Sequence, residues 1–282
     1  GGTTEFSMAT DTVSQYVVAP VSINAVSTDN LVGASEVLVV SGTSDPSATV
    51  AVTIGGSSYN DTANSSGVWT YTGSASSTML TSGANTITAA EVVSGLNSSA
   101  SVSVTLDAIA PVAPILALAT DSSSDGITNV ATVNVSGLEA GATWQYQVDS
   151  GTWTTGTGTS FSATAGSHTY AVRQTDAAGN LGAASTAVTY NLDATAPNGG
   201  SIALASDTGN SATDNITNNN QINVSGLEVG TTWQYSTTSG STWTTGTGTS
   251  FTLADGTYAA GVVRMRQIDA AGNVQATPAQ NA

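Results

Sequence analysis

The chain has 282 residues, with 19 acidic residues against three arginines, no lysine, one histidine and no cysteine, and a formal net charge of −16. Such a charge balance argues against binding to nucleic acid or to an anionic membrane surface, because both need a basic face. The missing cysteines exclude disulfides and thiolate metal sites, and no run of 18 apolar residues or signal-peptide pattern is present. Repulsion among so many carboxylates favours the uptake of divalent cations.

The chain opens without an initiator methionine, so we expect an internal fragment of a longer protein with an irregular or vector-derived lead. In the stretch that follows, apolar residues alternate at Val50, Val52 and Ile54, and again at Trp69 and Tyr71. A last run at 102–106 closes this first part of the chain. Alternation over four to seven residues between Gly, Asn, Asp and Ser predicts half-buried strands.

The remainder of the chain contains two copies of one module. Residues 134–139 recur as 223–228, 143–146 as 232–235, 152–161 as 242–251, and 176–180 as 269–273. Order and spacing are kept at an offset of roughly 90 residues, a usual size for a sandwich domain. We therefore predict an all-β chain of three tandem immunoglobulin-like β-sandwich domains in an extended rod, with boundaries at 1–108, 109–193 and 194–282.

Two short linkers join the three predicted domains. Each ends an alternating run with an aspartate, Asp107 or Asp193, and reaches a proline four residues later. Proline fixes φ and holds the preceding residue extended, so the segment is too stiff to be a floppy tether. Our hypothesis is that a calcium ion lies beside each linker aspartate and makes the joint rigid.

The motifs together resemble a known family. The order Asp-x-x-Ala-Pro, Val-Ser-Gly-Leu-Glu, Trp-x-Tyr and Asp-Ala-Ala-Gly-Asn is similar to bacterial immunoglobulin-like repeats from the extender regions of giant RTX/Bap-like Gram-negative surface adhesins. The resemblance covers the last two modules well and the first moderately. It implies stacked repeats that bind calcium at and near the linkers and hold an adhesive domain away from the cell. The first module departs from the pattern at 91–97, and residues 16–20 lack a linker aspartate, which argues against calcium at its N-terminal face.

The immunoglobulin topology places particular loops beside each linker and so gives a candidate set of calcium ligands. Calcium takes six to eight oxygens, which carboxylates, amides and linker carbonyls can supply. At the first linker the expected side chains are Asp29, Asn30, Glu36, Asp107, Glu139, Asp176 and Asn180. At the second they are Asp121, Asp125, Asp193, Glu228, Asp269 and Asn273. Asp207 and Asp214 make up a weaker, incomplete site in the last module.

Simpler roles remain open for several of these residues. Asp and Asn turn the chain in most loops, and Asp-Ala-Ala-Gly-Asn is also a natural hairpin. The loop at 121–126 resembles the start of an EF-hand, but Thr132 stands where that motif needs a bidentate Glu, so it is not one. We expect Trp144 and Trp233 to be core residues, Trp153 and Trp243 to cover a sheet edge, and His168 to be structural or solvated.

The function that the sequence favours is structural. We expect a calcium-rigidified extender of a secreted adhesin at the bacterial cell surface, serving attachment or biofilm formation, and not an enzyme. Its expected partners are the neighbouring repeats of the same monomeric chain, with no nucleic acid and no membrane insertion. The alternatives are a glycan- or protein-binding module of a surface protein, an S-layer-like protein, and accessory domains of a secreted enzyme.

Overall fold

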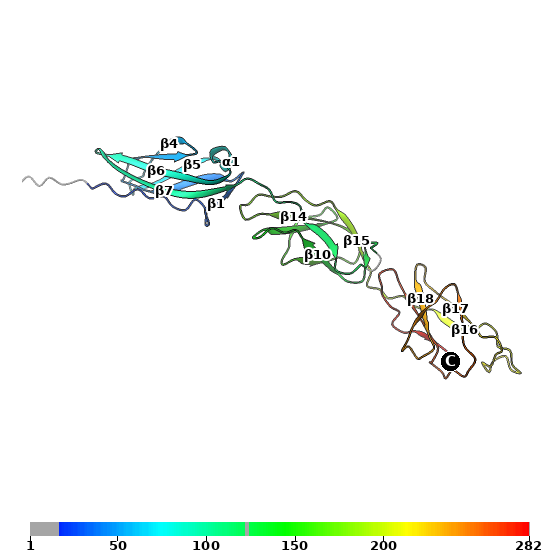
Figure 1. Ribbon diagram of the computed structural model, residues 1–282. Coiled ribbons are helices and arrows are strands. Elements are labelled where there is room, and N and C mark those ends of the chain that lie inside the picture. Colours follow the sequence, from blue (N-terminus) through cyan, green and yellow to red (C-terminus); the bar gives the residue numbers. More distant parts are fainter. Residues whose placement is uncertain (1–16, 122–123, 282) are drawn as a thin grey trace, which may run out of the picture. The chain divides into compact units, whose positions relative to one another are not determined.

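The computed structural model describes residues 17–121 and 124–281, and it is almost entirely β-structure, as predicted (Figure 1). By its internal contacts the chain divides into two compact units. The first contains residues up to Pro111 together with the loops Glu139–Ala142 and Thr175–Gly182, and the second contains the rest. The described residues include no helix long and apolar enough to cross a membrane.

The first unit contains a sandwich of two sheets, called here the first sandwich. Its strands are β1 (Leu31–Gly33), β2 (Val37–Thr43), β3 (Thr49–Ile54), β4 (Ser57–Thr62), β5 (Val68–Ala75), β6 (Gly83–Val93) and β7 (Leu96–Asp107), with a single helical turn α1 (Ser76–Met79). One sheet has the order β1-β7-β6-β3-β4, and β2 pairs with β5 in the other. The buried core residues come from both sheets.

Local sequence explains these hairpins. The alternation predicted at Val50, Val52 and Ile54 is observed, and all three side chains are buried in β3. The turn from β3 to β4 consists of Gly55 and Gly56, both at positive φ, a conformation that matches the twist of paired strands. In the turn from β6 to β7, Ser94 and Gly95 also have positive φ, at 52° and 78°.

The second unit contains two sandwiches whose strands follow the same order, except that one sheet of the second sandwich has an additional edge strand. The second sandwich is formed by β8 (Ile115–Leu118), β9 (Ile127–Thr128), β10 (Thr132–Ser136), β11 (Thr143–Val148), β12 (Thr154–Thr155), β13 (Ser160–Ser162), β14 (Gly166–Thr175) and β15 (Val188–Leu192). The third is formed by β16 (Ser201–Leu204), β17 (Gln221–Ser225), β18 (Thr232–Ser236), β19 (Thr244–Thr245), β20 (Ser250–Thr252), β21 (Arg264–Ile268) and β22 (Ala279–Gln280). Each has its own hydrophobic cluster.

The repeated sequence therefore produces repeated pairing. β10 lies between β8 and β13 in one sheet, as β17 lies between β16 and β20. In the facing sheets β11 pairs with β12 as β18 pairs with β19. An immunoglobulin-like β-sandwich is thus the fold, whereas the domain boundaries at 108 and 193 stay predictions.

Tryptophan and its neighbours form the centre of each repeated core. Trp144 and Trp233 are each 4% exposed, which confirms them as core residues. Their indole N–H groups donate to the carbonyls of Gly158 and Gly248 at 2.9 and 3.0 Å. The rings pack directly on backbone, because a Cβ added at Gly246 would lie 2.2 Å from the Trp233 ring.

The other two tryptophans of the repeats lie under arginine. The Arg173 guanidinium is 4.2 Å from the Trp153 ring centre, and Arg266 is 4.1 Å from that of Trp243. Each guanidinium also donates two hydrogen bonds to a glutamine oxygen on the neighbouring strand. Cation and indole thus hold one another in a fixed stack on the sheet.

We predict that Gly246→Ala destabilises the third sandwich by about 1–3 kcal/mol, because the new methyl group overpacks the Trp233 indole. Urea denaturation followed by tryptophan fluorescence measures the change. Thr247→Ser, at the exposed neighbouring position, is the matched control and should differ from the parent by less than about 0.5 kcal/mol. Equal midpoints for the parent and Gly246→Ala would contradict the close packing.

Candidate functional site

Both linker aspartates cap the turn that follows them. The Asp107 carboxylate accepts the backbone N–H of Ile109 at 3.0 Å, and the Asp193 carboxylate accepts that of Thr195 at 2.9 Å. Both residues are half-buried at the end of a closing strand. This arrangement is the Asx turn in which an aspartate bonds to the backbone two residues on, and it accounts for one role of each carboxylate.

The Asp-Ala-Ala-Gly-Asn loops have the same internal geometry in both copies. The Asp176 carboxylate accepts the backbone N–H and the side-chain amide N–H of Asn180, both at 2.8 Å. In the second copy Asp269 binds Asn273 in the same two ways, at 2.8 and 2.9 Å. The predicted hairpin is therefore present, and in it the aspartate orients the asparagine.

The oriented asparagines hold the linkers. The Asn180 Nδ2 atom donates to the Asp107 carbonyl at 2.9 Å, and Asn273 Nδ2 donates to the Asp193 carbonyl at 2.8 Å. On its other side the Asn180 Oδ1 atom accepts the backbone N–H of Ala34 at 2.9 Å. Asn180 is 8% exposed, so these bonds are shielded from water. We call this contact, from loop asparagine to linker carbonyl, the linker clamp.

Glycine makes room for the first clamp. A Cβ at Gly33 would lie 2.4 Å from the Ala178 carbonyl oxygen and 3.1 Å from Asn180 Oδ1. Gly33 is also the register partner of Asp107 in the parallel β1–β7 pair. The first unit thus brings Asp107, Asp176, Asn180 and the turn after Gly33 to one place.

The remaining predicted ligands at the first linker are engaged in local turns. Asp29 accepts the backbone N–H of Leu31 and the hydroxyl of Ser27, and these bonds hold the pKa of its carboxyl below the usual value. Asn30 has a positive φ of 58° and accepts the N–H of Val26. Glu36 accepts the N–H of Gly33 at 3.4 Å, and Glu139 lies at the start of the loop Glu139–Ala142.

The second unit contains the other candidates. Asp121 accepts the N–H groups of Asp125 and Gly126 at 3.2 and 3.1 Å, and Asp125 accepts that of Ile127. Glu228 accepts the Asn198 N–H at 2.7 Å, beside the linker proline. In the last module Asp207 accepts the N–H of Asn215 and Asp214 that of Ile216, while the second Asp207 oxygen is buried without a partner.

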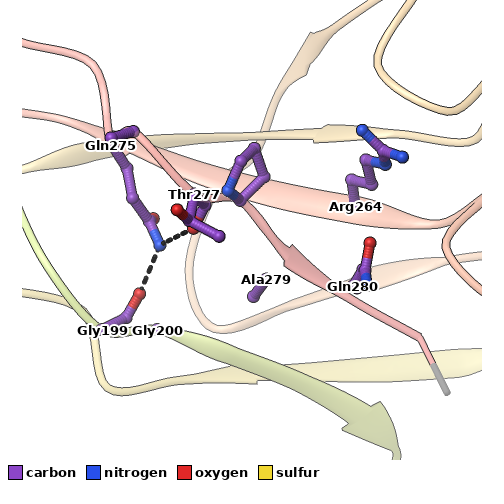
Figure 2. Close-up of a pocket in the computed structure, with 9 residues that line it drawn as sticks. Gly199, Gly200, Arg264, Gln275, Thr277, Ala279 and Gln280 are labelled. Carbon is purple, nitrogen blue, oxygen red and sulfur yellow. Dashed lines mark hydrogen bonds between the residues drawn. The ribbon is translucent and has the colours of Figure 1, made fainter.

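These carboxylates do not form a compact cluster. Within the described part of the chain, no three acidic or histidine side chains are grouped so that they could hold a metal ion. The pocket shown in Figure 2 is no substitute, because none of its lining residues is acidic. There Gln275 donates to the carbonyls of Gly199 and Thr277, so it ties the chain that follows the second linker to the segment that precedes β22.

Sequence reasoning missed a second set of linker contacts. Gln174 Nε2 donates to the Val112 carbonyl at 2.7 Å and to that of Gly137 at 3.1 Å. In the next copy Gln267 Nε2 donates to the Asn198 carbonyl at 3.1 Å. The available signal was a glutamine in the core phase of an alternating strand, after Tyr170 and Val172, repeated in both modules.

His168 is not free in solvent. Its Nδ1 atom pairs with the carboxylate of Asp149, which also accepts the backbone N–H of Thr169 at 2.8 Å. The hydrogen bond to Asp149 raises the pKa of His168 above 6.5, and the same bond lowers the pKa of Asp149 below 3.8. The pair ties the turn after β11 to β14, which is a structural role.

Comparison with known proteins adds solved structures only. No family model matches the chain, and no curated protein matches it. One similar structure is a Ca²⁺-stabilized adhesin that helps an Antarctic bacterium reach out and bind ice (TM-score 0.42, 19% identity, 94% of this chain and 74% of that chain). Another concerns host cell surface retention of a 1.5-MDa bacterial ice-binding adhesin (TM-score 0.40, 18% identity, 94% and 98%).

A third is a tetra-tandem repeat in the extending region of a large adhesion protein, with TM-score 0.27, 20% identity, and coverage of 93% of this chain and 73% of that chain. Likenesses at these TM-scores assign neither a family nor a ligand to this chain. The function is therefore argued from its own residues.

We predict that Asn273→Ala lowers the stability of the third sandwich by about 1–2 kcal/mol, because the Asp193 carbonyl and the Asp269 carboxylate lose a donor. Asn273→Asp should cost more, since it places a carboxylate against both. Urea denaturation measures the loss, with Asn210→Ala in an exposed loop as control. The linker clamp would be unsupported if Asn273→Ala and the control gave the same midpoint.

The ion pair gives a pH-dependent prediction. Its contribution is fully present between the usual pKa values of 3.8 for Asp and 6.5 for His, and it fades as pH rises through the raised pKa of His168 or falls through the lowered pKa of Asp149. The stability difference between the parent and His168→Gln should therefore shrink from pH 6 to pH 8. Thermal melts across that range test this, and a constant difference would contradict it.

Proposed function

We propose that this chain is a structural spacer from a bacterial surface adhesin, in which calcium bound at the linkers stiffens the joints between successive sandwiches. The observation that carries the proposal is the duplicated linker. Twice, an aspartate ends a closing strand, and twice an asparagine from an Asp-Ala-Ala-Gly-Asn loop donates to that aspartate's carbonyl. A joint that is repeated along the chain favours a mechanical role, because an adhesive or substrate-binding site needs to be present only once.

The charge distribution supports calcium as the occupant. Two of the three arginines, Arg173 and Arg266, are already committed to tryptophan rings and glutamine oxygens. These two cations are therefore not available to the linker carboxylates, and the third, Arg264, donates to the Gly261 carbonyl at 2.8 Å. Calcium is a hard cation that takes carboxylate, amide and carbonyl oxygens in flexible geometry, and those are the donor types at both linkers.

Binding would be coupled to stiffening. Because no three acidic side chains are grouped within the described residues, an ion at a linker has to draw carboxylates together. At the second linker the donors available within the unit are Asp193, Asp121, Asp125, Glu228 and Asp269. Free energy released on binding then favours the closed joint over the open one.

The calcium affinity expected for such sites suits a secreted protein. Extracellular calcium modules typically bind with dissociation constants of about 10⁻⁴–10⁻³ M, so occupancy would follow the surrounding medium. At a tenfold excess over the dissociation constant each site stabilises the chain by about 1.4 kcal/mol. That amount is a useful fraction of the stability of a small domain. A spacer of this kind needs no catalytic group, which agrees with the expectation that the chain is not an enzyme.

We predict that calcium raises the melting temperature and narrows the distribution of interdomain distances in small-angle scattering, relative to chelator. Asp193→Ala should lose the effect at the second linker. Asp193→Asn is the matched variant, because its Oδ1 atom can still accept the Thr195 N–H but carries no charge. If Asp193→Asn responds to calcium as the parent does, the carboxylate serves only the turn and the ligand assignment is wrong.

A further inference from the structure

The three sandwiches place a polar side chain at one equivalent position in the core. On the strand that pairs with the closing strand, two apolar residues in the core phase are followed by a buried polar one. In the second and third sandwiches this residue is Gln174 or Gln267, 1% and 0% exposed. In the first sandwich it is Glu91, on β6 after Ile87 and Ala89, and it is 2% exposed.

The glutamines show what this position requires. Both use Nε2 as a donor to the carbonyl of the residue that directly follows the linker proline, Val112 or Asn198. The Gln267 Oε1 atom in turn accepts the backbone N–H of Glu228 at 2.7 Å. The Gln267 oxygen therefore accepts from the loop after β17, and its nitrogen donates to a backbone carbonyl beside the linker proline.

Glu91 can do only the first of these. Its Oε2 atom accepts the backbone N–H of Asp45 at 3.2 Å, in the corresponding loop. Its Oε1 atom is buried and has no hydrogen-bond partner among the described residues. An ionised carboxylate has no N–H or O–H to donate, so the hydrogen-bond donor that the glutamines supply is missing at this position.

A second carboxylate has the same deficit. Asp45 is 7% exposed and uses Oδ1 to accept the Ala19 N–H at 3.3 Å, while its Oδ2 atom is buried without a partner. The first 108 residues contain no lysine, arginine or histidine that could compensate. Burial, and then the nearby Asp45 carboxylate, raise the pKa of Glu91, which agrees with a site that disfavours two uncompensated charges.

We propose that Asp45 and Glu91 bind one calcium ion through these two buried oxygens, with backbone carbonyls completing its shell. A single proton would neutralise only one of the two carboxylates, whereas a divalent cation neutralises both. The ligands available are oxygens alone, which suits a hard cation, and calcium tolerates irregular geometry better than magnesium does.

This site is distinct from the linker sites and does not rest on the spacer function. Glu91 is the register partner of Ser98 on β7, nine residues before Asp107 on the same strand. At about 3.3 Å per residue, that separation along the strand is about 30 Å. The proposed ion therefore lies at the pole of the first sandwich opposite Asp107, where the chain enters past Ala19. Calcium was not expected there from the sequence.

Hydrogen–deuterium exchange of the full chain, in calcium chloride and in chelator at pH 7.5, tests the proposal at the site itself. Calcium should slow exchange at least tenfold in peptides covering residues 44–48 and 86–93. In Glu91→Gln the same peptides should exchange slowly in both conditions, because an amide supplies the donor found in the other two sandwiches. Equilibrium dialysis should show one fewer bound calcium ion for this variant.

Two controls separate the possible outcomes. Asp107→Asn, at the opposite pole, should leave the calcium response of residues 86–93 intact, so failure of the linker sites and failure of this site are distinguishable. Asp45→Asn should abolish the response and serves as the second variant if Glu91→Gln does not fold. The proposal is overturned if Glu91→Gln keeps the calcium response. It is also overturned if the parent ignores calcium but is protected by lowering the pH to 5.5 in chelator, which would assign a proton to Glu91.

Discussion

The linkers depend on hydrogen bonds that amide side chains donate to the backbone carbonyls of the linker segments. A segment that contains proline and lies between two strands has carbonyl groups without ladder partners. Asn180, Asn273, Gln174 and Gln267 supply the missing donors. A primary amide is suited to this place because it donates and accepts without carrying charge.

These amides work because other groups fix their orientation. Asp176 and Asp269 hold the asparagines through paired bonds, and Gly33 leaves space for the first of them. The same acid residues that suggested metal binding from sequence are thus engaged with backbone or amide N–H groups. An acceptor in such a turn keeps lone pairs for a cation, so turn and ligand roles are compatible at Asp107 and Asp193.

The sequence predicted the parts of the fold that depend on periodicity. Alternation at Val50, Val52 and Ile54 correctly indicated buried strand faces, and repetition of Trp144 as Trp233 correctly indicated equivalent cores. The hairpin in the Asp-Ala-Ala-Gly-Asn loop was also foreseeable, since Asp, Gly and Asn favour turns for known reasons. Convergence of this loop on the Asp107 linker followed from immunoglobulin topology.

What could not be predicted depends on which atom of a polar side chain faces which partner. Nothing in the sequence shows that Asn180 turns its nitrogen, not its oxygen, toward the linker carbonyl. Gln174 is one polar residue in an alternating strand, and its bond to the linker depends on the fold. Asp45 and Glu91 are 46 residues apart, so their proximity is evident only after folding. The pairing of His168 with Asp149 likewise depends on the turn geometry at Asp149, whose φ is 49°.

The stacking of arginine on tryptophan has a consequence for digestion by proteases. Trypsin-like proteases cut after lysine or arginine, and these 282 residues offer only three such bonds, all of them after arginine. Arg173 lies within β14, and Arg264 and Arg266 lie within β21, so their backbones are held in sheets. Two of the three side chains are also pinned on indole rings and cannot enter a specificity pocket without leaving them. Digestion by that class of enzyme therefore has to wait for a sandwich to unfold.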